Sequence, residues 1–133
     1  FIRQFNFTNP PRIVLGRSEE VDSRYKEDCK AIKERGSVKN HLEKKYLSRG
    51  NHYHMTLNNY PYFMEEGIVH YVIWFKGEHF GKYNNQSEIN SIIRDYMISN
   101  HVNDKCEYTF YQNIEELRSI PSIPHLHVFM KLF

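Results

Sequence analysis

The chain has 133 residues, of which 40% are hydrophobic and 15% aromatic, and its formal net charge at pH 7 is +2. This length supports a hydrophobic core but is too short for two domains of ordinary size, so we expect a single domain over residues 1–133. So small a positive charge does not indicate the strongly basic surface typical of nucleic-acid-binding proteins. No apolar run approaches the roughly 18–20 residues of a membrane span, so no membrane association is expected.

Two cysteines, Cys29 and Cys106, are far apart in the chain and have no CxxC spacing. This pattern disfavours both a disulfide framework and a cysteine-ligated zinc site. Reduced thiols are typical of cytoplasmic proteins, so we expect a cytoplasmic location.

The first part of the chain predicts a helical hairpin. Ser18 precedes two glutamates, which is typical of a helix start, because acidic side chains are favourable near the positive end of the helix dipole. Apolar residues then recur at helical spacing until Gly36, where we expect the first helix to end. Ser37 predicts the start of a second helix that reaches Leu47. The charged residues around both helices are most simply a solvated outer face.

Residues 48–67 are predicted to form a long connection. Connections of this length in a compact domain are often functional, so Asn51 and Tyr62 are candidate site residues. The alternative is a surface loop anchored by its aromatic side chains.

The run from Ile68 to Phe75 is apolar on both faces and therefore predicts a central strand. Trp74, within it, is expected to be largely buried. Gly77 and Gly81 predict a turn region after the strand, and Ser87 predicts the cap of a further helix with an apolar stripe.

Three further elements are predicted towards the C-terminus. Alternating side chains indicate a strand over residues 106–111, a helical turn is expected within 114–120, and a last strand follows over 125–132. The predicted fold class is therefore α+β: a single domain with an N-terminal helical hairpin, a further helix and a small, mostly antiparallel sheet.

Three histidines carry the strongest hint of a site. Side chains of a strand point to alternate faces, so His125 and His127 share one face of the last strand. We expect this strand to lie beside residues 68–75, with His70 on the same face as the pair. The alternative is that His70 is a hydrogen-bonded core residue, which is the commoner role for a lone histidine on an apolar strand.

Several short motifs occur in the order known from one family: Leu15-Gly16-Arg17-Ser18, Gly36-Ser37-Val38, Asn59-Tyr60-Pro61-Tyr62, Gly67 to Trp74, Leu117-Arg118-Ser119-Ile120 and His125-Leu126-His127-Val128. The chain resembles the fungal N-acetylglucosamine-induced protein 1, whose DUF3605-like domain of unknown function also occurs in other eukaryotes and in large DNA viruses. A viral or protist member would fit the abundance of Asn, Lys, Ile and Tyr. The resemblance implies a cytosolic domain with a shared polar site and no established mechanism. Where the family tends to carry Asn-Pro, this chain has Asn113-Ile114.

Nine polar residues are predicted to converge: Arg17, Asn51, Tyr62, His70, Asn113, Arg118, Ser119, His125 and His127. Arg17 stands just before a helix N-terminus, where backbone N–H groups favour anions. Arg118 offers a bidentate donor for phosphate or carboxylate, unless it only ties its loop to a backbone carbonyl or a surface acid. No phosphate-binding glycine loop, nucleophile elbow or paired-carboxylate motif is present, which disfavours glycosidase chemistry.

These residues favour the first of three functions, with the other two as alternatives, and they favour an anionic small molecule over nucleic acid as the partner. The first is a pocket for a phosphorylated small molecule, such as a nucleotide or sugar phosphate, with arginines on the anion and histidines as hydrogen-bond donors or proton carriers. The second is an enzyme whose divalent metal ion is held by His70, His125 and His127. The third is a module that binds nucleic acid or a protein through aromatic and basic residues without catalysis.

Overall fold

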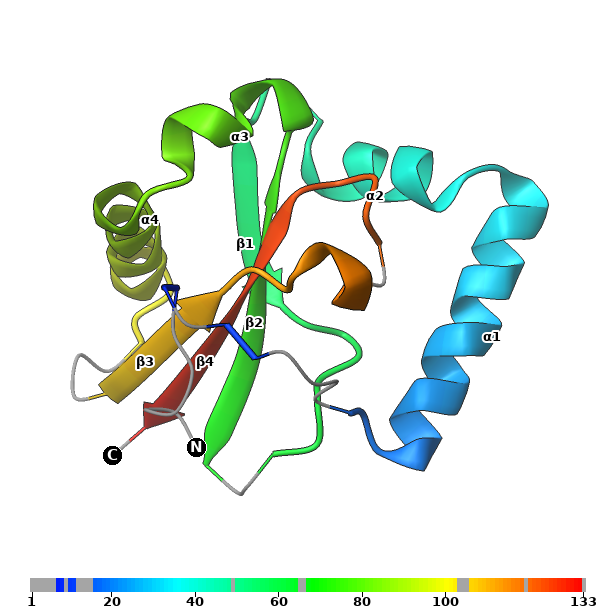
Figure 1. Cartoon of the computed structure of the whole chain (residues 1–133), viewed down its shortest axis with the longest axis horizontal. Coiled ribbons are helices and arrows are strands. Elements are labelled where there is room, and N and C mark those ends of the chain that lie inside the picture. The colour runs from blue at the N-terminus through cyan, green and yellow to red at the C-terminus, as the bar shows by residue number, and fades with distance from the viewer. Residues whose placement is uncertain are drawn as a thin grey trace.

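A computed structural model describes residues 7–8, 10–11, 16–48, 50–64, 67–102, 106–118 and 120–132. Its elements are α1 (Glu19–Arg35), α2 (Val38–Tyr46), β1 (Tyr53–Leu57), β2 (Ile68–Phe75), α3 (Gly77–Tyr83), α4 (Gln86–Ser99), β3 (Cys106–Tyr111), the 3-10 turn η1 (Glu115–Leu117) and β4 (His125–Leu132). The four strands form one antiparallel sheet in the order β1-β2-β4-β3. Figure 1 shows the sheet between α4 on one side and α1 and α2 on the other. The predicted α+β class is confirmed.

The helical hairpin is built as its local sequence predicts. Ser18 Oγ accepts a hydrogen bond from the Val21 backbone N–H, and α1 ends before Gly36, whose φ of 153° favours glycine. Ser37 Oγ in turn accepts from the Asn40 backbone N–H at the start of α2. Both caps satisfy backbone donors that a helix start leaves without partners.

The two central strands bring the histidines together. In the antiparallel pair of β2 and β4, His70 lies opposite Phe129, Val72 opposite His127, and Trp74 opposite His125. Directly opposed residues share a face of the sheet, so all three histidines lie on one face, as predicted. We call this the histidine face. Trp74 is 8% exposed, which confirms its predicted burial.

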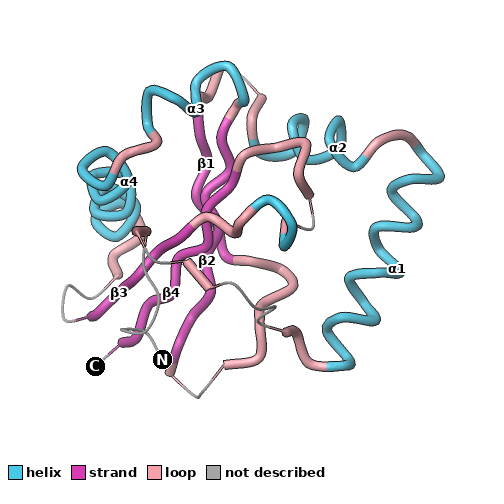
Figure 2. Tube along the Cα trace, viewed as in Figure 1, coloured by secondary structure: helices cyan, strands magenta, loops and turns pink. Residues whose placement is uncertain are grey.

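The opposite face of the sheet carries the main hydrophobic core. Ile73 of β2 and Leu126 and Val128 of β4 are fully buried there with Ile89 and Ile93 of α4. The histidine face has a second apolar cluster, formed by Leu47, Val72, Trp74 and Ile123. The hairpin packs above this second cluster, and Figure 2 shows both of its helices on the side of the sheet away from α4.

One strand was not predicted. β1 lies inside the stretch 48–67 that was expected to be a connection, and it pairs with the edge of β2. Its side chains alternate, with Met55 buried on the core face and Leu57 exposed at its end. The sequence Tyr53 to Leu57 is short and half polar, and its pairing with β2 stabilises it as a strand.

The region after β2 also differs from the prediction. α3 forms where two glycines predicted a turn, because Phe80 and Tyr83 pack against Phe75 and the core. α4 begins two residues earlier than expected: Asn85 is its cap, with Oδ1 accepting from the Glu88 backbone N–H, and Ser87 lies inside the helix. The predicted helical turn is present as η1. None of the helices in the described ranges combines the length and the hydropathy that a membrane span requires.

Candidate functional site

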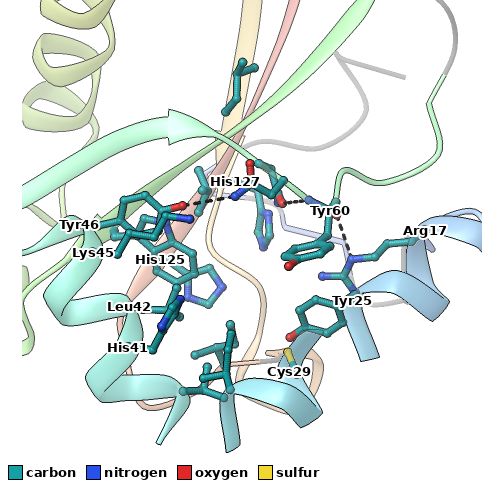
Figure 3. Close-up of a pocket in the computed structure, with 18 residues that line it drawn as sticks. Arg17, Tyr25, Cys29, His41, Leu42, Lys45, Tyr46, Tyr60, His125 and His127 are labelled. Atoms are coloured by element: carbon teal, nitrogen blue, oxygen red, sulfur yellow. Dashed lines mark hydrogen bonds between the residues drawn. The ribbon is translucent and has the colours of Figure 1, made fainter. Parts of the chain in front are cut away.

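A cavity lies between the helical hairpin and the histidine face of the sheet (Figure 3). Its volume is about 90 Å³. Its walls come from both helices, the segment after β1, the two central strands and the loop before β4. The lining residues are Arg17, Tyr25, Cys29, Ile32, Val38, His41, Leu42, Lys45, Tyr46, Leu57, Asn58, Asn59, Tyr60, Val72, Trp74, Ile120, His125 and His127. A polar cavity of this size accommodates several water molecules or one small charged group.

The charge of the lining is one-sided. Arg17 and Lys45 are cationic, and the lining includes no aspartate or glutamate. Aromatic rings of Tyr25, Tyr46 and Trp74 form much of the wall. Partial exclusion of water by such rings strengthens the interaction of the cations with an anion. The cavity therefore suits a small anionic group.

Arg17 is held rigidly at the cavity wall. Its side chain is 14% exposed, and its Nε–H donates to the Tyr60 backbone carbonyl at 2.9 Å. The guanidinium carbon lies 4.1 Å from the centre of the Tyr25 ring, a favourable cation–π distance. Nη1 is 3.9 Å from Asp22 Oδ1, too far for a hydrogen bond. The terminal nitrogens are thus only loosely neutralised while the side chain is fixed in place.

His125 lines the cavity and, as a neutral ring, has one unprotonated nitrogen. Its Nδ1–H donates to the Ile123 backbone carbonyl at 2.9 Å, which places the proton of the neutral ring on Nδ1 and the lone pair on Nε2. Burial lowers the pKa of His125, opposed by the bond to Ile123 and aided by the charge of Arg118. Figure 3 shows the ring directed towards the space between the two helices. A neutral His125 can accept a hydrogen bond or a proton from a ligand.

His70 and His127 form a buried hydrogen-bonded pair beneath the cavity. His70 Nε2 lies 2.8 Å from His127 Nδ1, and the Tyr62 backbone N–H donates to His70 Nδ1 at 3.1 Å. A backbone N–H can only donate, so the neutral His70 carries its proton on Nε2 and donates it to His127. His127 then carries its own proton on Nε2. The backbone of Tyr62 therefore sets the tautomers of both rings.

The pair ends at Tyr62 and Asn113. The Tyr62 hydroxyl lies 3.4 Å from His127 Nε2, and Asn113 Nδ2 lies 3.2 Å from the same nitrogen and 3.1 Å from that hydroxyl. Because the amide nitrogen and oxygen exchange places on a half-turn, the same geometry lets Asn113 Oδ1 accept the Nε2 proton. The network therefore joins Tyr62, His70, Asn113 and His127 inside the protein.

Both paired histidines are neutral at physiological pH. Burial lowers the pKa of His70 to about 3, with Arg17 and His125 acting in the same direction. Burial also lowers the pKa of His127 far below its usual value, and His70 adds to this. Among the residues that the structure describes, no group of three or more His, Cys, Asp or Glu side chains could hold a metal ion. Since His70 and His127 face each other, the geometry does not favour the metal alternative.

The predicted site residues fall into distinct groups. Arg17, His125 and His127 line the cavity. Tyr62, His70 and Asn113 belong to the buried network behind it. The remaining three do not join these groups, and each has its own position.

Arg118 does not line the cavity. Its Nε–H donates to the Asn113 backbone carbonyl at 2.8 Å, which matches the alternative prediction that Arg118 ties its loop to a backbone carbonyl. Asn51 is exposed in the segment before β1 and lies outside the cavity lining. Ser119 lies outside the described residues.

Sequence reasoning missed the contribution of the hairpin to the site. Tyr25 and Cys29 of α1 and Lys45 and Tyr46 of α2 all line the cavity. Tyr25 and Cys29 follow the helical apolar period, which identifies an inward-facing stripe but not what it faces. Lys45 carried no local signal, because its place in the lining depends on how α2 packs against the sheet.

Comparisons with known proteins place the chain in a family. Residues 13–131 match the family model described as "Protein of unknown function (DUF3605)". The chain belongs to the DUF3605 family. The crystal structure of a protein named HTC1 is similar, with a TM-score of 0.58 and 22% sequence identity over 90% of this chain and 76% of that chain. At this identity the likeness shows a shared fold alone. A comparison with curated proteins finds no significant match.

Proposed function

We propose that this DUF3605 domain binds a small phosphorylated molecule and that its phosphate occupies the cavity. One observation carries the proposal: the cavity is lined by Arg17 and Lys45, and no carboxylate opposes them in the lining. Arg17 is largely buried and only loosely paired with Asp22, so an anion in the cavity would compensate its charge more fully. A phosphate supplies both the charge and the hydrogen-bond acceptors.

Each side chain of the cavity has a distinct role in this proposal. Arg17, already fixed through Nε, directs its terminal nitrogens to the phosphate oxygens. Lys45 is exposed and adds a point charge from α2. His125 Nε2 accepts a hydrogen bond from a protonated oxygen of the ligand, and the same lone pair would serve as a general base. The His70–His127 pair fixes the floor of the site.

The cavity volume limits what enters it. About 90 Å³ holds a phosphate group but is far below the roughly 300–1,000 Å³ of pockets that enclose whole organic ligands. The phosphate-bearing end of the molecule is therefore the part that is enclosed. Sugar phosphates and nucleotides both present such an end. The resemblance to N-acetylglucosamine-induced protein 1 adds sugar phosphates to the candidates, and a cytoplasmic location, where such metabolites occur, belongs to the same proposal.

A thermal-shift screen of sugar phosphates and nucleotides, followed by calorimetry on the best binder, tests the proposal. Arg17→Lys keeps the charge but loses the fixed fork, so affinity should fall by roughly tenfold or more. Arg94 is exposed on α4, on the other side of the sheet, and Arg94→Lys is the matched control. Binding that survives Arg17→Lys unchanged, or a screen in which no phosphorylated compound stabilises the protein, overturns the proposal. Metal analysis of the purified protein tests the His-ligated alternative directly.

A further inference from the structure

A groove adjoins the cavity along α1. Its lining consists of Tyr25, Lys26, Cys29, Lys30, Lys33, Glu34, Val38, Ile120, Pro121 and Ser122, and its volume is about 740 Å³. Tyr25, Cys29, Val38 and Ile120 line both the groove and the cavity, so the two spaces share one wall. We call this space the lysine groove. The lysine groove is therefore the immediate neighbour of the cavity.

Three lysines of α1 follow the groove in a row. Lys26, Lys30 and Lys33 are four and three residues apart, so they lie on one side of the helix and span about 10 Å along its axis. Lys26 Nζ is 2.9 Å from Asp22 Oδ2, whereas in the described part of the chain neither Lys30 nor Lys33 forms a salt bridge. Glu34 is the carboxylate in the groove lining. Two lysine charges therefore remain available to a ligand.

The walls of the lysine groove are of two kinds. The α1 side is basic, while Ile120 and Pro121 from the loop before β4 are apolar. A row of cations opposite an apolar wall suits a molecule with several negative charges along one edge and an organic part. The groove volume lies within the range of pockets that bind organic ligands, whereas the cavity volume does not.

We propose that the ligand of this site is a nucleoside diphosphate or triphosphate. Its terminal phosphate occupies the cavity at Arg17 and Lys45, its remaining phosphates lie along Lys30 and Lys33, and its nucleoside lies in the lysine groove. This inference rests on the proposed function, because the cavity must hold a phosphate for the chain of phosphates to begin there. What it adds is the class of ligand, because in this assignment a chain of phosphates engages both the cations of the cavity and the lysines of the groove.

Calorimetry with AMP, ADP and ATP in the presence of EDTA, without divalent metal ions, tests the inference. Each added phosphate should tighten binding by up to about fivefold, the upper end of the range for one exposed charge pair. The double variant Lys30→Gln/Lys33→Gln should lose most of this gain while its affinity for AMP changes by less than about twofold. Lys82→Gln/Arg94→Gln removes the same charge from α3 and α4 and should leave all three affinities within about twofold.

The outcomes separate this inference from the proposed function. Equal affinities for AMP, ADP and ATP, or equal losses in the two double variants, overturn the polyphosphate assignment and leave phosphate binding in the cavity intact. Binding of sugar monophosphates without binding of any nucleotide does the same. If no phosphorylated compound binds, both proposals fail. Circular dichroism and thermal unfolding of each variant show that these exposed substitutions leave the fold unchanged.

Discussion

Two imidazole rings meet between β2 and β4, with His70 Nε2 2.8 Å from His127 Nδ1. A second proton on His70 would go to Nδ1 and break the hydrogen bond from the Tyr62 backbone N–H, whereas a second proton on His127 would go to Nδ1 and break the contact with His70. A buried imidazolium would also lack a carboxylate partner in this network. The hydrogen bond between the two rings therefore allows both polar side chains to be buried on the histidine face. It requires both rings to remain neutral.

The first prediction is a loss of stability in mild acid. The folded-state pKa of His70 is lowered to about 3 and that of His127 is also lowered, whereas unfolded histidine titrates near pH 6.5. The unfolded chain therefore binds more protons below pH 6.5, and the stability present above this pH is lost as the pH falls towards the folded pKa values. Well below pH 6.5, each of these two histidines should lower the free energy of unfolding by about 1.4 kcal/mol for every unit by which the pH falls.

Urea denaturation at pH 7, 6 and 5 measures this slope in a range where carboxylates contribute little. His70→Gln should make the pH dependence shallower by about one proton, and the same replacement of the exposed His101 is the matched control. An equal free energy of unfolding for the wild type at pH 7 and pH 5 would contradict neutral burial of the pair.

At the scale of the elements, α2 contacts the sheet through aromatic rings at Trp74, beside the apolar contact of Leu42. The Tyr46 ring is stacked on Trp74, with ring centroids 5.9 Å apart and planes 8° from parallel, and the His125 ring lies 4.8 Å from Trp74. Trp74 thus joins α2 to both central strands. The same stack positions one wall of the cavity.

The second prediction follows from this position. Trp74→Ala should lower the free energy of unfolding by about 3–5 kcal/mol, the range for large aromatic side chains in a core. Leu57→Ala, at a site that is 51% exposed at the end of β1, should cost less than about 1 kcal/mol. Chemical denaturation of both variants measures the difference. A loss of less than about 1 kcal/mol for Trp74→Ala would show that α2 is held by other contacts.

A third prediction concerns the start of α4. Asn85→Ala removes the oxygen that accepts from the Glu88 backbone N–H and should destabilise the protein by about 1 kcal/mol. Ser87→Ala, inside the first turn, should change stability by no more than a few tenths of a kcal/mol. Thermal unfolding of the two variants distinguishes them, and a larger effect at Ser87 would restore the helix start expected from the sequence.

The elements that could be predicted from sequence are those with local signals. Ser18 and Ser37 are helix caps that act within one turn, and β2 is apolar on both faces. These elements can therefore be predicted without knowledge of the rest of the fold. β1 and α3 form because of what they pack against: β1 pairs with the edge of β2, and Phe80 of α3 packs on the core. Local propensity is weak in both, and tertiary contacts decide.

The candidate site was predictable only in part for the same reason. The shared face of His70, His125 and His127 follows from strand periodicity once the two strands pair. The contact between His70 and His127 requires the register of strands 57 residues apart, and no local pattern encodes it. The place of Lys45 in the cavity depends on the docking of a whole helix on the sheet. The residue types of the site could thus be predicted from the sequence, whereas the strand register and the docking of α2 could not.

At the scale of the whole molecule, the two sides of the sheet are packed differently. α4 buries Ile89, Ile92 and Ile93 against the sheet, whereas neither α1 nor α2 contains a buried residue in the part of the chain that the structure describes. Few buried apolar contacts mean low local stability, so the hairpin should open more readily than the core. The cavity and the lysine groove both lie on this less stable side.

The last prediction follows from that asymmetry. A ligand that contacts Arg17 and Lys45 joins the hairpin to the sheet, so it should protect α1 and α2 against opening more than it protects α4. Hydrogen exchange with and without saturating ATP measures this: amides of the hairpin should slow several-fold, in line with the free energy that binding adds to the closed form. Amides of α4 that exchange by local fraying should be unaffected. Equal slowing across α1, α2 and α4 would mean that the ligand stabilises only the global fold, and slowing confined to α4 would place its binding on the other side of the sheet.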